Sequence, residues 1–216
     1  FPEKVTPNHH ALASEFVLLD NFYVEAQVSA DGHEWTTGAY ANDFVEKTWP
    51  SNYGDHGLDY PAEGAYKTAL PTAGYIWDMC AKAGVSYRSL GEFVNHPNGL
   101  DKPGVPSVPA LEGHIDPHFI GWDLSYPDVK RAERFISEFN REVASGEWPN
   151  FVIMRLPNDH TAGSSEGELT PIAYVADNDL ALGMVIEAIT KSPIWKDTAV
   201  FVVEDDAQAG PDHVDA

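Results

Sequence analysis

Residues 198–206 read Thr-Ala-Val-Phe-Val-Val-Glu-Asp-Asp, an unbroken apolar run that stops at three acids. The run Ala199–Val203 is rich in β-branched residues and is typical of a strand covered on both faces, as in a parallel sheet. In open α/β sheets, ligands bind just beyond the carboxyl ends of strands. Asp205 and Asp206 would repel each other there unless a cation or protons neutralise them, and His213 follows after a Gly-Pro turn. Carboxylates with an imidazole indicate a divalent metal site, and a solvated acidic loop is the alternative.

A second apolar run ends in the same way. Residues 151–156 (Phe-Val-Ile-Met-Arg-Leu) predict a central strand, and the polar cluster that follows contains Asp159 and His160. A third strand is expected at 16–19. Amphipathic spacing predicts helices over 128–145, which ends at Gly146, and over 178–190. Alternating strands and helices without a linker predict one α/β domain with a mostly parallel sheet.

Ser29 is the candidate nucleophile. It lies between a predicted strand and a predicted helix, where free backbone N–H groups at a helix N-terminus stabilise an anion. His33 is close enough in the sequence to reach the same pocket. The alternative is that Ser29 caps the helix and His33 is a surface residue. Further on, His114, Asp116 and His118 lie in a proline-rich loop and could contact a metal or a phosphate, although their spacing fits no single ligand template.

Composition narrows the class of protein. The 216 residues carry 34 acids and 13 Lys or Arg, which gives a net charge of −21. Long-range attraction to nucleic acid or to an anionic membrane needs a basic face, so neither is an expected partner. No apolar stretch is long enough for stable membrane insertion. The single cysteine, Cys80, excludes an internal disulfide framework.

Three segments together resemble a known family: 28–33 (Val-Ser-Ala-Asp-Gly-His), 156–161 (Leu-Pro-Asn-Asp-His-Thr) and 203–215, which runs from Val-Glu-Asp-Asp to Asp-His-Val-Asp. They are similar to the bacterial phosphoesterase family of acid phosphatases and phospholipase C-type enzymes. The resemblance implies an alkaline-phosphatase-like three-layer sandwich. It also implies a periplasmic or extracellular location.

The resemblance also assigns roles to residues. Ser29 matches the nucleophile, with Thr36 and Thr37 as alternatives nearby, and His33 would face the phosphate. The implied metal ligands are Asp205, Asp206, His213, Asp159 and His160. Mixed carboxylate and imidazole donors suit zinc, manganese, iron or calcium.

The expected reaction is hydrolysis of a phosphoester small molecule or a phospholipid head group through a Ser29 phosphoenzyme. The metal would activate Ser29, and His33 or His118 would protonate the leaving oxygen or stabilise the transferring group. An aromatic loop expected over 49–66 would set substrate choice. At its net charge of −21 the chain needs a bound cation to admit a phosphate.

One departure from the family pattern affects these expectations. Family members begin with a strand that ends in an acid-Asn pair, which this chain lacks, and they continue beyond residue 216. The chain is therefore expected to be an interior fragment of a single domain, cut at both ends, and a poor phosphatase by itself. The alternatives are a non-catalytic metal-binding or interaction module and a sulfatase of the same fold. The Cys/Ser-x-Pro-x-Arg pattern usual in sulfatases is absent.

Overall fold

The structure is a computed structural model that describes residues 1–24 and 26–206. The chain divides into two compact units, and each is described by itself. Unit 1 contains residues 1–19, 88–106 and 113–199. Unit 2 contains the described residues of 20–87, 107–112 and 200–206.

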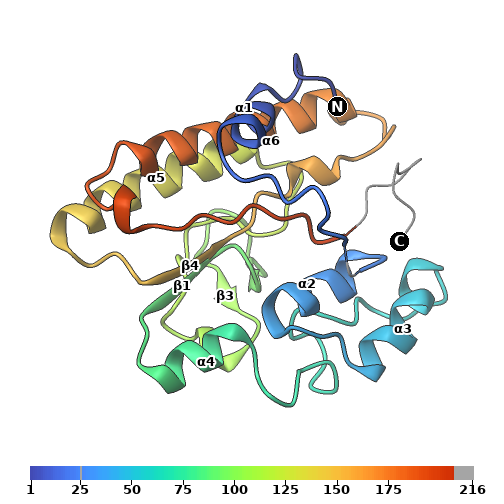
Figure 1. Cartoon of the computed structure of the whole chain (residues 1–216). Helices are drawn as coiled ribbons and strands as arrows, with labels where there is room; N and C mark the ends of the chain where they lie inside the picture. The colour runs from blue at the N-terminus through green and yellow to red at the C-terminus, as the bar shows by residue number, and fades with distance from the viewer. Residues whose placement is uncertain (25, 207–216) are drawn as a thin grey trace. The chain divides into compact units, whose positions relative to one another are not determined.

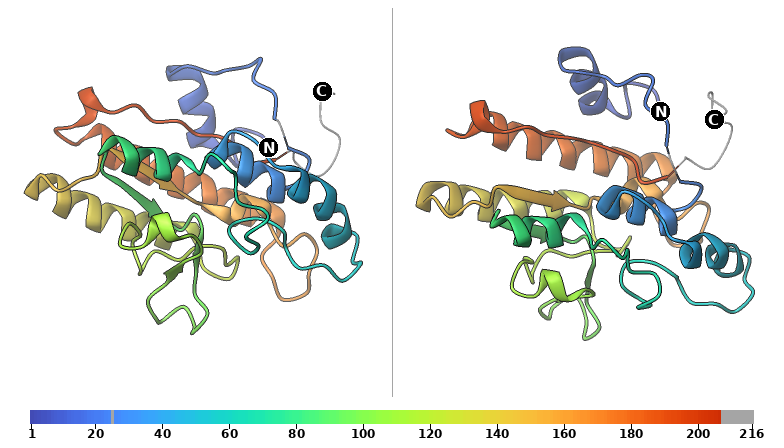
Figure 2. Two further views of the ribbon diagram at one scale, coloured as in Figure 1. Left: turned by 90° about the horizontal axis from the view of Figure 1, so that it is seen from below. Right: turned by 60° about the horizontal axis from the view of Figure 1, so that its bottom comes forward.

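Helices dominate unit 1. The helices α5 (Asp128–Ser145) and α6 (Pro171–Thr190) lie side by side along their lengths (Figures 1 and 2). The helix α5 stops where Gly146 takes a φ of 75°, a left-handed conformation that glycine adopts without strain. The helix α6 begins at Pro171 and is capped by Thr170, whose side chain accepts the N–H of Ala173. The bounds predicted for α5 are confirmed, and α6 begins seven residues earlier than the predicted 178.

The core of unit 1 forms between these two helices and the strand region. Its buried members come from α5, α6 and the neighbouring segments: Leu90, Phe119, Ala132, Phe135, Phe139, Ala181, Val185 and Ile189. The short helix α1 (Pro7–Glu15) is held to α6 by buried Asp179, whose carboxylate accepts the backbone N–H groups of Asn8 and His9. The same carboxylate also bonds both of their side chains. One carboxylate thus satisfies helix N-terminal donors that would otherwise need water.

The strands of unit 1 are short. Strand β1 (Tyr87–Leu90), which belongs to unit 1 from Arg88 onward, and strand β4 (Phe151–Met154) form one two-stranded sheet. Strands β2 (Val94–Asn95) and β3 (Val105–Pro106) form a second, antiparallel pair. Two 3₁₀ turns, η2 (Pro157–His160) and η3 (Trp195–Asp197), complete the unit. The mixed α/β class is confirmed, whereas the three-layer sandwich with a mostly parallel central sheet stays a prediction.

Two predicted strands are wrong. Neither Phe16–Leu19 nor Ala199–Val203 is a strand in the described structure, and their side chains are exposed where burial was expected. Phe201, at the middle of the second run, is 83% exposed. An apolar, β-branched run has the propensity for a strand, but it becomes one only when a neighbouring strand supplies ladder hydrogen bonds. The sequence of the run itself does not reveal whether that neighbour is present.

Unit 2 contains three helices in its described residues: α2 (Ser29–Gly38), α3 (Asp43–Tyr53) and α4 (Ile76–Ala83), together with the turn η1 (Pro109–Leu111). Asn42 starts α3 by accepting the N–H groups of Phe44 and Val45. The aromatic loop expected over 49–66 is therefore partly helical. A small core joins α2 to α3 through buried alanines and a valine: Ala30, Val45, Ala62 and Ala69. No helix among residues 1–24 and 26–206 combines the length and apolar character needed to cross a membrane.

Candidate functional site in unit 2

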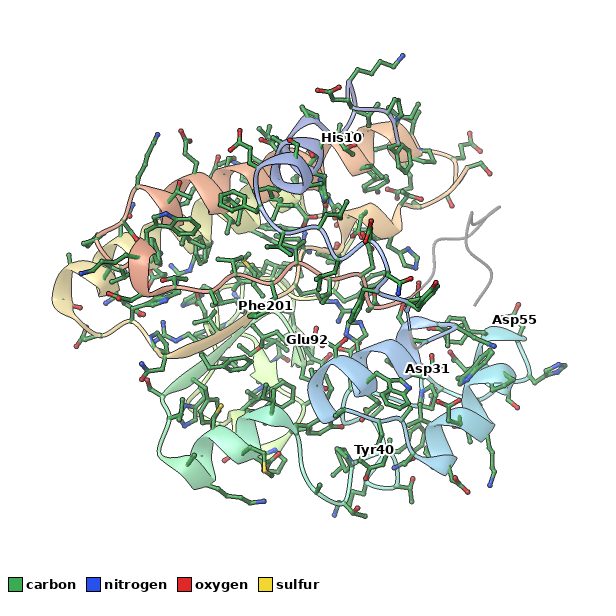
Figure 3. The ribbon with its side chains drawn as sticks, viewed as in Figure 1. His10, Asp31, Tyr40, Asp55, Glu92 and Phe201 are labelled. Carbon is green, nitrogen blue, oxygen red and sulfur yellow. The ribbon has the colours of Figure 1, made fainter. Side chains whose placement is uncertain are left out.

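Ser29 is the first residue of α2. The preceding residue, Val28, is extended, and its N–H donates to the carboxylate of Asp31 at 3.1 Å, which fixes the start of the helix. Asp31 is labelled on this helix in Figure 3. The Ser29 hydroxyl donates to Asp206 Oδ2 at 2.7 Å. A hydroxyl at a helix N-terminus, bonded to a carboxylate that can accept its proton, has the geometry of an activated nucleophile.

Gly32 explains how the acidic segment reaches α2. A Cβ built on Gly32 would lie 1.9 Å from the carbonyl oxygen of Asp205, so only glycine permits this close backbone approach. The approach places Asp205 beside the second residue of the site, His33. The ring Nε2 of His33 lies 3.2 Å from Asp205 Oδ2 and 3.6 Å from Glu63 Oε1. His33 is 6% exposed, so this imidazole is not the surface residue of the alternative interpretation.

Glu34 is a buried acid that the sequence analysis missed. Its Oε1 accepts the hydroxyl of Tyr75 at 3.0 Å, and its Oε2 is buried without a hydrogen-bond partner in the described part of the chain. Burial raises the pKa of Glu34 to about 7, and the nearby carboxylate of Glu63 adds to the effect. The pattern of α2 gave no signal for this, because the burial comes from contacts made by residues 63 and 75.

Tyr53 is a second missed residue. It is the last residue of α3, and the side chain of Ser29 and the backbone of Ala30 are close enough to its hydroxyl to act on its pKa. Burial raises the pKa of Tyr53, and the carboxylates of Asp206 and Asp205 raise it further. The phenol therefore keeps its proton near neutral pH and can donate a hydrogen bond next to Ser29.

The hydroxyls of the alternative nucleophiles, Thr36 and Thr37, lie in surroundings that differ from those of Ser29. Thr37 is buried, and its hydroxyl donates to the backbone carbonyl of His33 at 2.5 Å, within the helix. Thr36 is exposed. The Ser29 hydroxyl, in contrast, donates to a carboxylate, which favours Ser29 as the nucleophile.

Three predicted site residues belong to unit 1. Asp159 and His160 lie on η2, directly after β4, as the apolar run predicted. His160 Nδ1 lies 2.9 Å from the carbonyl oxygen of Thr161, an acceptor to which Nδ1 donates, and in the neutral form of this tautomer Nε2 carries the lone pair. His118 is exposed, and its backbone N–H donates to Asp116, which is paired with Arg134. The loop around His118 is thereby ordered.

The predicted metal ligands have donor atoms of the kinds that bind a divalent cation. Asp205 and Asp206 supply adjacent carboxylates, and an imidazole with its Nδ1 engaged, such as His160, has the tautomer of a metal ligand. In residues 1–24 and 26–206, no group of three or more His, Cys, Asp or Glu side chains is arranged to hold a metal ion. His213, the remaining predicted ligand, lies outside the described residues.

Comparison with known proteins adds one finding. A family model described as the Phosphoesterase family matches residues 1–216, the whole of the chain. No curated protein and no solved structure shows a significant match.

Proposed function

The chain belongs to the phosphoesterase family, which implies hydrolysis of phosphoesters, and from that premise we propose that Ser29 carries the reaction as a nucleophile. The observation that supports this assignment is the 2.7 Å hydrogen bond from the Ser29 hydroxyl, at the start of α2, to Asp206. The substrate class is a small-molecule phosphoester, and a phospholipid head group is one member of that class.

In the first step Ser29 Oγ attacks phosphorus and the bond to the ester oxygen breaks. Asp206 Oδ2 is placed to receive the proton of Ser29. His33, held by Asp205, gives a proton to the leaving oxygen, which departs as an alcohol. The N-terminal N–H groups of α2 and the Tyr53 hydroxyl stabilise the phosphoryl oxygens. In the second step water attacks the phosphoserine and gives a proton to His33, and Asp206 returns a proton to Ser29. Orthophosphate leaves when the substrate is a monoester, and a phosphomonoester leaves when it is a diester.

We further propose that the reaction depends on a divalent cation held by Asp205 and Asp206, with a contribution from His213. Asp159 and His160, in unit 1, keep their sequence-based assignment as ligands. When bound, such a cation lowers the pKa of the Ser29 hydroxyl and polarises a phosphoryl oxygen. It also reduces the repulsion between a phosphate and a chain of net charge −21. Zinc, manganese, iron and calcium remain the candidates.

The test is hydrolysis of p-nitrophenyl phosphate with added Mn²⁺, Zn²⁺ or Ca²⁺, followed by acid quenching and peptide mapping of the phosphorylated residue. The wild type should release phosphate and carry the phosphoryl group on Ser29, and Ser29→Ala should lose both. Thr36→Ala is the matched control, because it removes an exposed hydroxyl from the same helix. Undiminished phosphate release by Ser29→Ala, or a phosphoryl group on another residue, would refute the assignment. Bis(p-nitrophenyl) phosphate in parallel distinguishes diester from monoester preference.

A further inference from the structure

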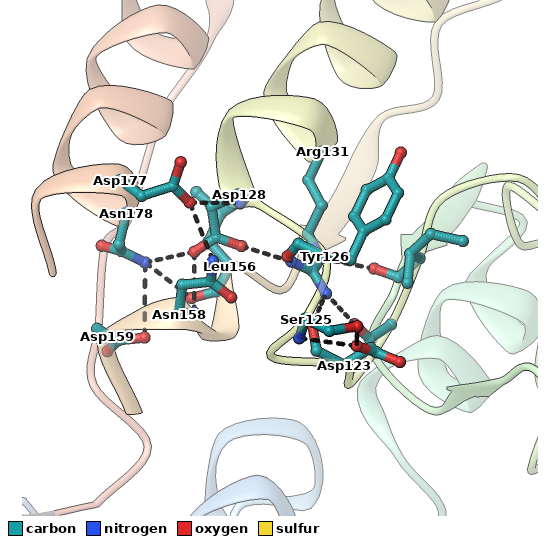
Figure 4. A network of polar contacts seen from close by, with 12 residues as sticks. Asp123, Ser125, Tyr126, Asp128, Arg131, Leu156, Asn158, Asp159, Asp177 and Asn178 are labelled. Carbon is teal, nitrogen blue, oxygen red and sulfur yellow. Dashed lines mark hydrogen bonds and ion pairs between the residues drawn. The ribbon is translucent and has the colours of Figure 1, made fainter. Parts of the chain in front are cut away.

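A charged pair lies fully buried at the start of α5, in unit 1. Arg131 Nη1 lies 3.0 Å from Asp128 Oδ1, and both side chains are 0% exposed. Removing two charges from water is costly unless hydrogen bonds satisfy their remaining donors and acceptors. Here those bonds reach out to two loops, one on each side of the pair (Figure 4).

Arg131 organises the first loop. Its guanidinium donates to the backbone carbonyls of Ile120, Gly121 and Asp123, each within 2.8 Å, and also to the carbonyl of Tyr126. Four carbonyls bound by one planar group give the loop 120–126 a single conformation. This loop carries Trp122, which is 48% exposed.

Asp128 organises the second loop, the turn η2 that carries Asp159 and His160. Its Oδ2 accepts the backbone N–H of Asn158 at 2.9 Å and the Nδ2 of Asn178, from α6, at 3.0 Å. The same Asn178 Nδ2 donates to the carbonyl of Leu156 at 2.9 Å. The amide thus joins Asp128 to the residue at which β4 leads into the turn.

The side chain of Asn158 is also held by a residue of α6. Its Nδ2 donates to Asp177 at 3.0 Å, while its Oδ1 is buried and has no hydrogen-bond partner among the residues that the structure describes. Leaving a buried acceptor unsatisfied costs about 1–3 kcal/mol. The position of the turn is therefore set by Asp128, Asp177 and Asn178, although it leaves one atom of Asn158 unsatisfied.

The two loops meet at their exposed ends. The ring of Trp122 contacts the ring of His160 edge to face, with centroids 4.8 Å apart. Arg155, at the end of β4, lies over the Trp122 ring at 5.1 Å. A buried network thus ends at the two adjacent residues, Asp159 and His160, for which the sequence predicts a functional role.

We propose that Asp128 and Asn178 are positioning residues, which hold Asp159 and His160 in the geometry that phosphoester hydrolysis requires. This inference rests on the proposed function, since it assigns Asp159 and His160 to the same chemistry. Neither Asp128 nor Asn178 touches the substrate. Both act through the backbone of residues 156–158, and Asn178 Nδ2 also donates to Asp159 Oδ1 at 3.5 Å.

Asn178→Ala is the variant to test. Changing Asp128 alone leaves Arg131 charged and buried, and that variant can simply fail to fold. Asn178→Ala removes no charge, but it removes the bonds to Asp128 Oδ2, to the Leu156 carbonyl and to Asp159 Oδ1. Asn8→Ala is the matched control. It removes the side-chain bond to Asp179, the next residue on α6, which holds α1 and not the turn.

Three measurements decide the outcome. Asn178→Ala should lower both kcat for p-nitrophenyl phosphate and Mn²⁺ affinity by titration calorimetry about 10- to 100-fold, the usual effect of removing a group that orients a ligand. KM should change little, because the substrate contacts remain. The backbone N–H of Asn158 should exchange with solvent faster. Asn8→Ala should show none of these effects.

Equal losses in Asn178→Ala and Asn8→Ala would overturn the proposal, since both would then report lost stability. So would unchanged kcat and Mn²⁺ affinity in a variant whose Asn158 amide exchanges faster. If the wild type neither hydrolyses phosphoesters nor binds Mn²⁺, the proposed function fails separately. Amide exchange then decides the positioning: faster exchange at Asn158 in Asn178→Ala alone supports it, and unchanged exchange refutes it.

Discussion

Glu34→Gln tests how strongly unit 2 buries an acid beside its candidate site. The pKa of Glu34 rises from 4.5 to about 7, chiefly through burial. The groups that face it are Tyr75, Glu63 and His33. A rise of this size corresponds to about 3 kcal/mol of folding free energy. Because the folded-state pKa is raised, this contribution is fully present below the unfolded pKa and is lost as pH rises from about 4.5 to about 7.

Glutamine keeps the acceptor for Tyr75 and cannot ionise. Near pH 4 wild type and Glu34→Gln should be about equally stable, and at pH 8 the variant should be more stable by up to about 3 kcal/mol. Urea unfolding of the whole chain at both pH values measures the difference. Glu112→Gln, an exposed acid of the same unit, is the control and should show no such pH dependence. A stability difference between Glu34→Gln and wild type that is the same at both pH values would refute the buried, raised-pKa description.

Three further changes test single contacts. Gly32→Ala should lower the free energy of unfolding by about 1–3 kcal/mol and reduce hydrolysis, because the new Cβ would lie 1.9 Å from the Asp205 carbonyl oxygen. A variant with wild-type stability and rate would contradict this close backbone contact. Phe201→Ser should change the free energy of unfolding by only about 0.5 kcal/mol, since Phe201 is 83% exposed. A loss of stability of several kcal/mol would indicate that Phe201 lies in a buried strand instead. Tyr53→Phe should lower kcat/KM by about tenfold, which is the effect of losing one hydrogen bond near Ser29. An unchanged kcat/KM would show that the Tyr53 hydroxyl takes no part in the reaction.

The elements that the sequence predicted correctly are those determined by local pattern. The helix α5 has an apolar stripe and a glycine terminator, and both are properties of one continuous segment. The strand β4 was found from its apolar run, and the turn with Asp159 and His160 follows it directly. The helix α2, in contrast, begins at Ser29, seven residues before the helix-compatible spacing at 36–45.

The rest of the site depends on contacts between distant segments, which no local pattern contains. The burial of Glu34 comes from residues 63 and 75, and the Tyr53 hydroxyl reaches Ser29 from another helix. The exposure of Ala199–Val203 has the same origin, since burial of a strand depends on its neighbours and not on its own residues. Gly32 could have been noticed as a glycine inside a helix, because such glycines often permit close backbone approach.

The electrostatics of α2 explain why a cation belongs to the proposal. The N-terminus of a helix attracts an anion, and in this structure Asp206 occupies that position with its carboxylate on the Ser29 hydroxyl. A phosphate that approaches the Ser29 hydroxyl is therefore repelled by the Asp206 carboxylate, which is hydrogen-bonded to that hydroxyl, and by the adjacent Asp205. The helix N-terminus alone, equivalent to roughly half a positive charge, cannot balance two carboxylates and a phosphate. A divalent cation held by Asp205 and Asp206, as proposed, would offset this negative charge and polarise a phosphoryl oxygen.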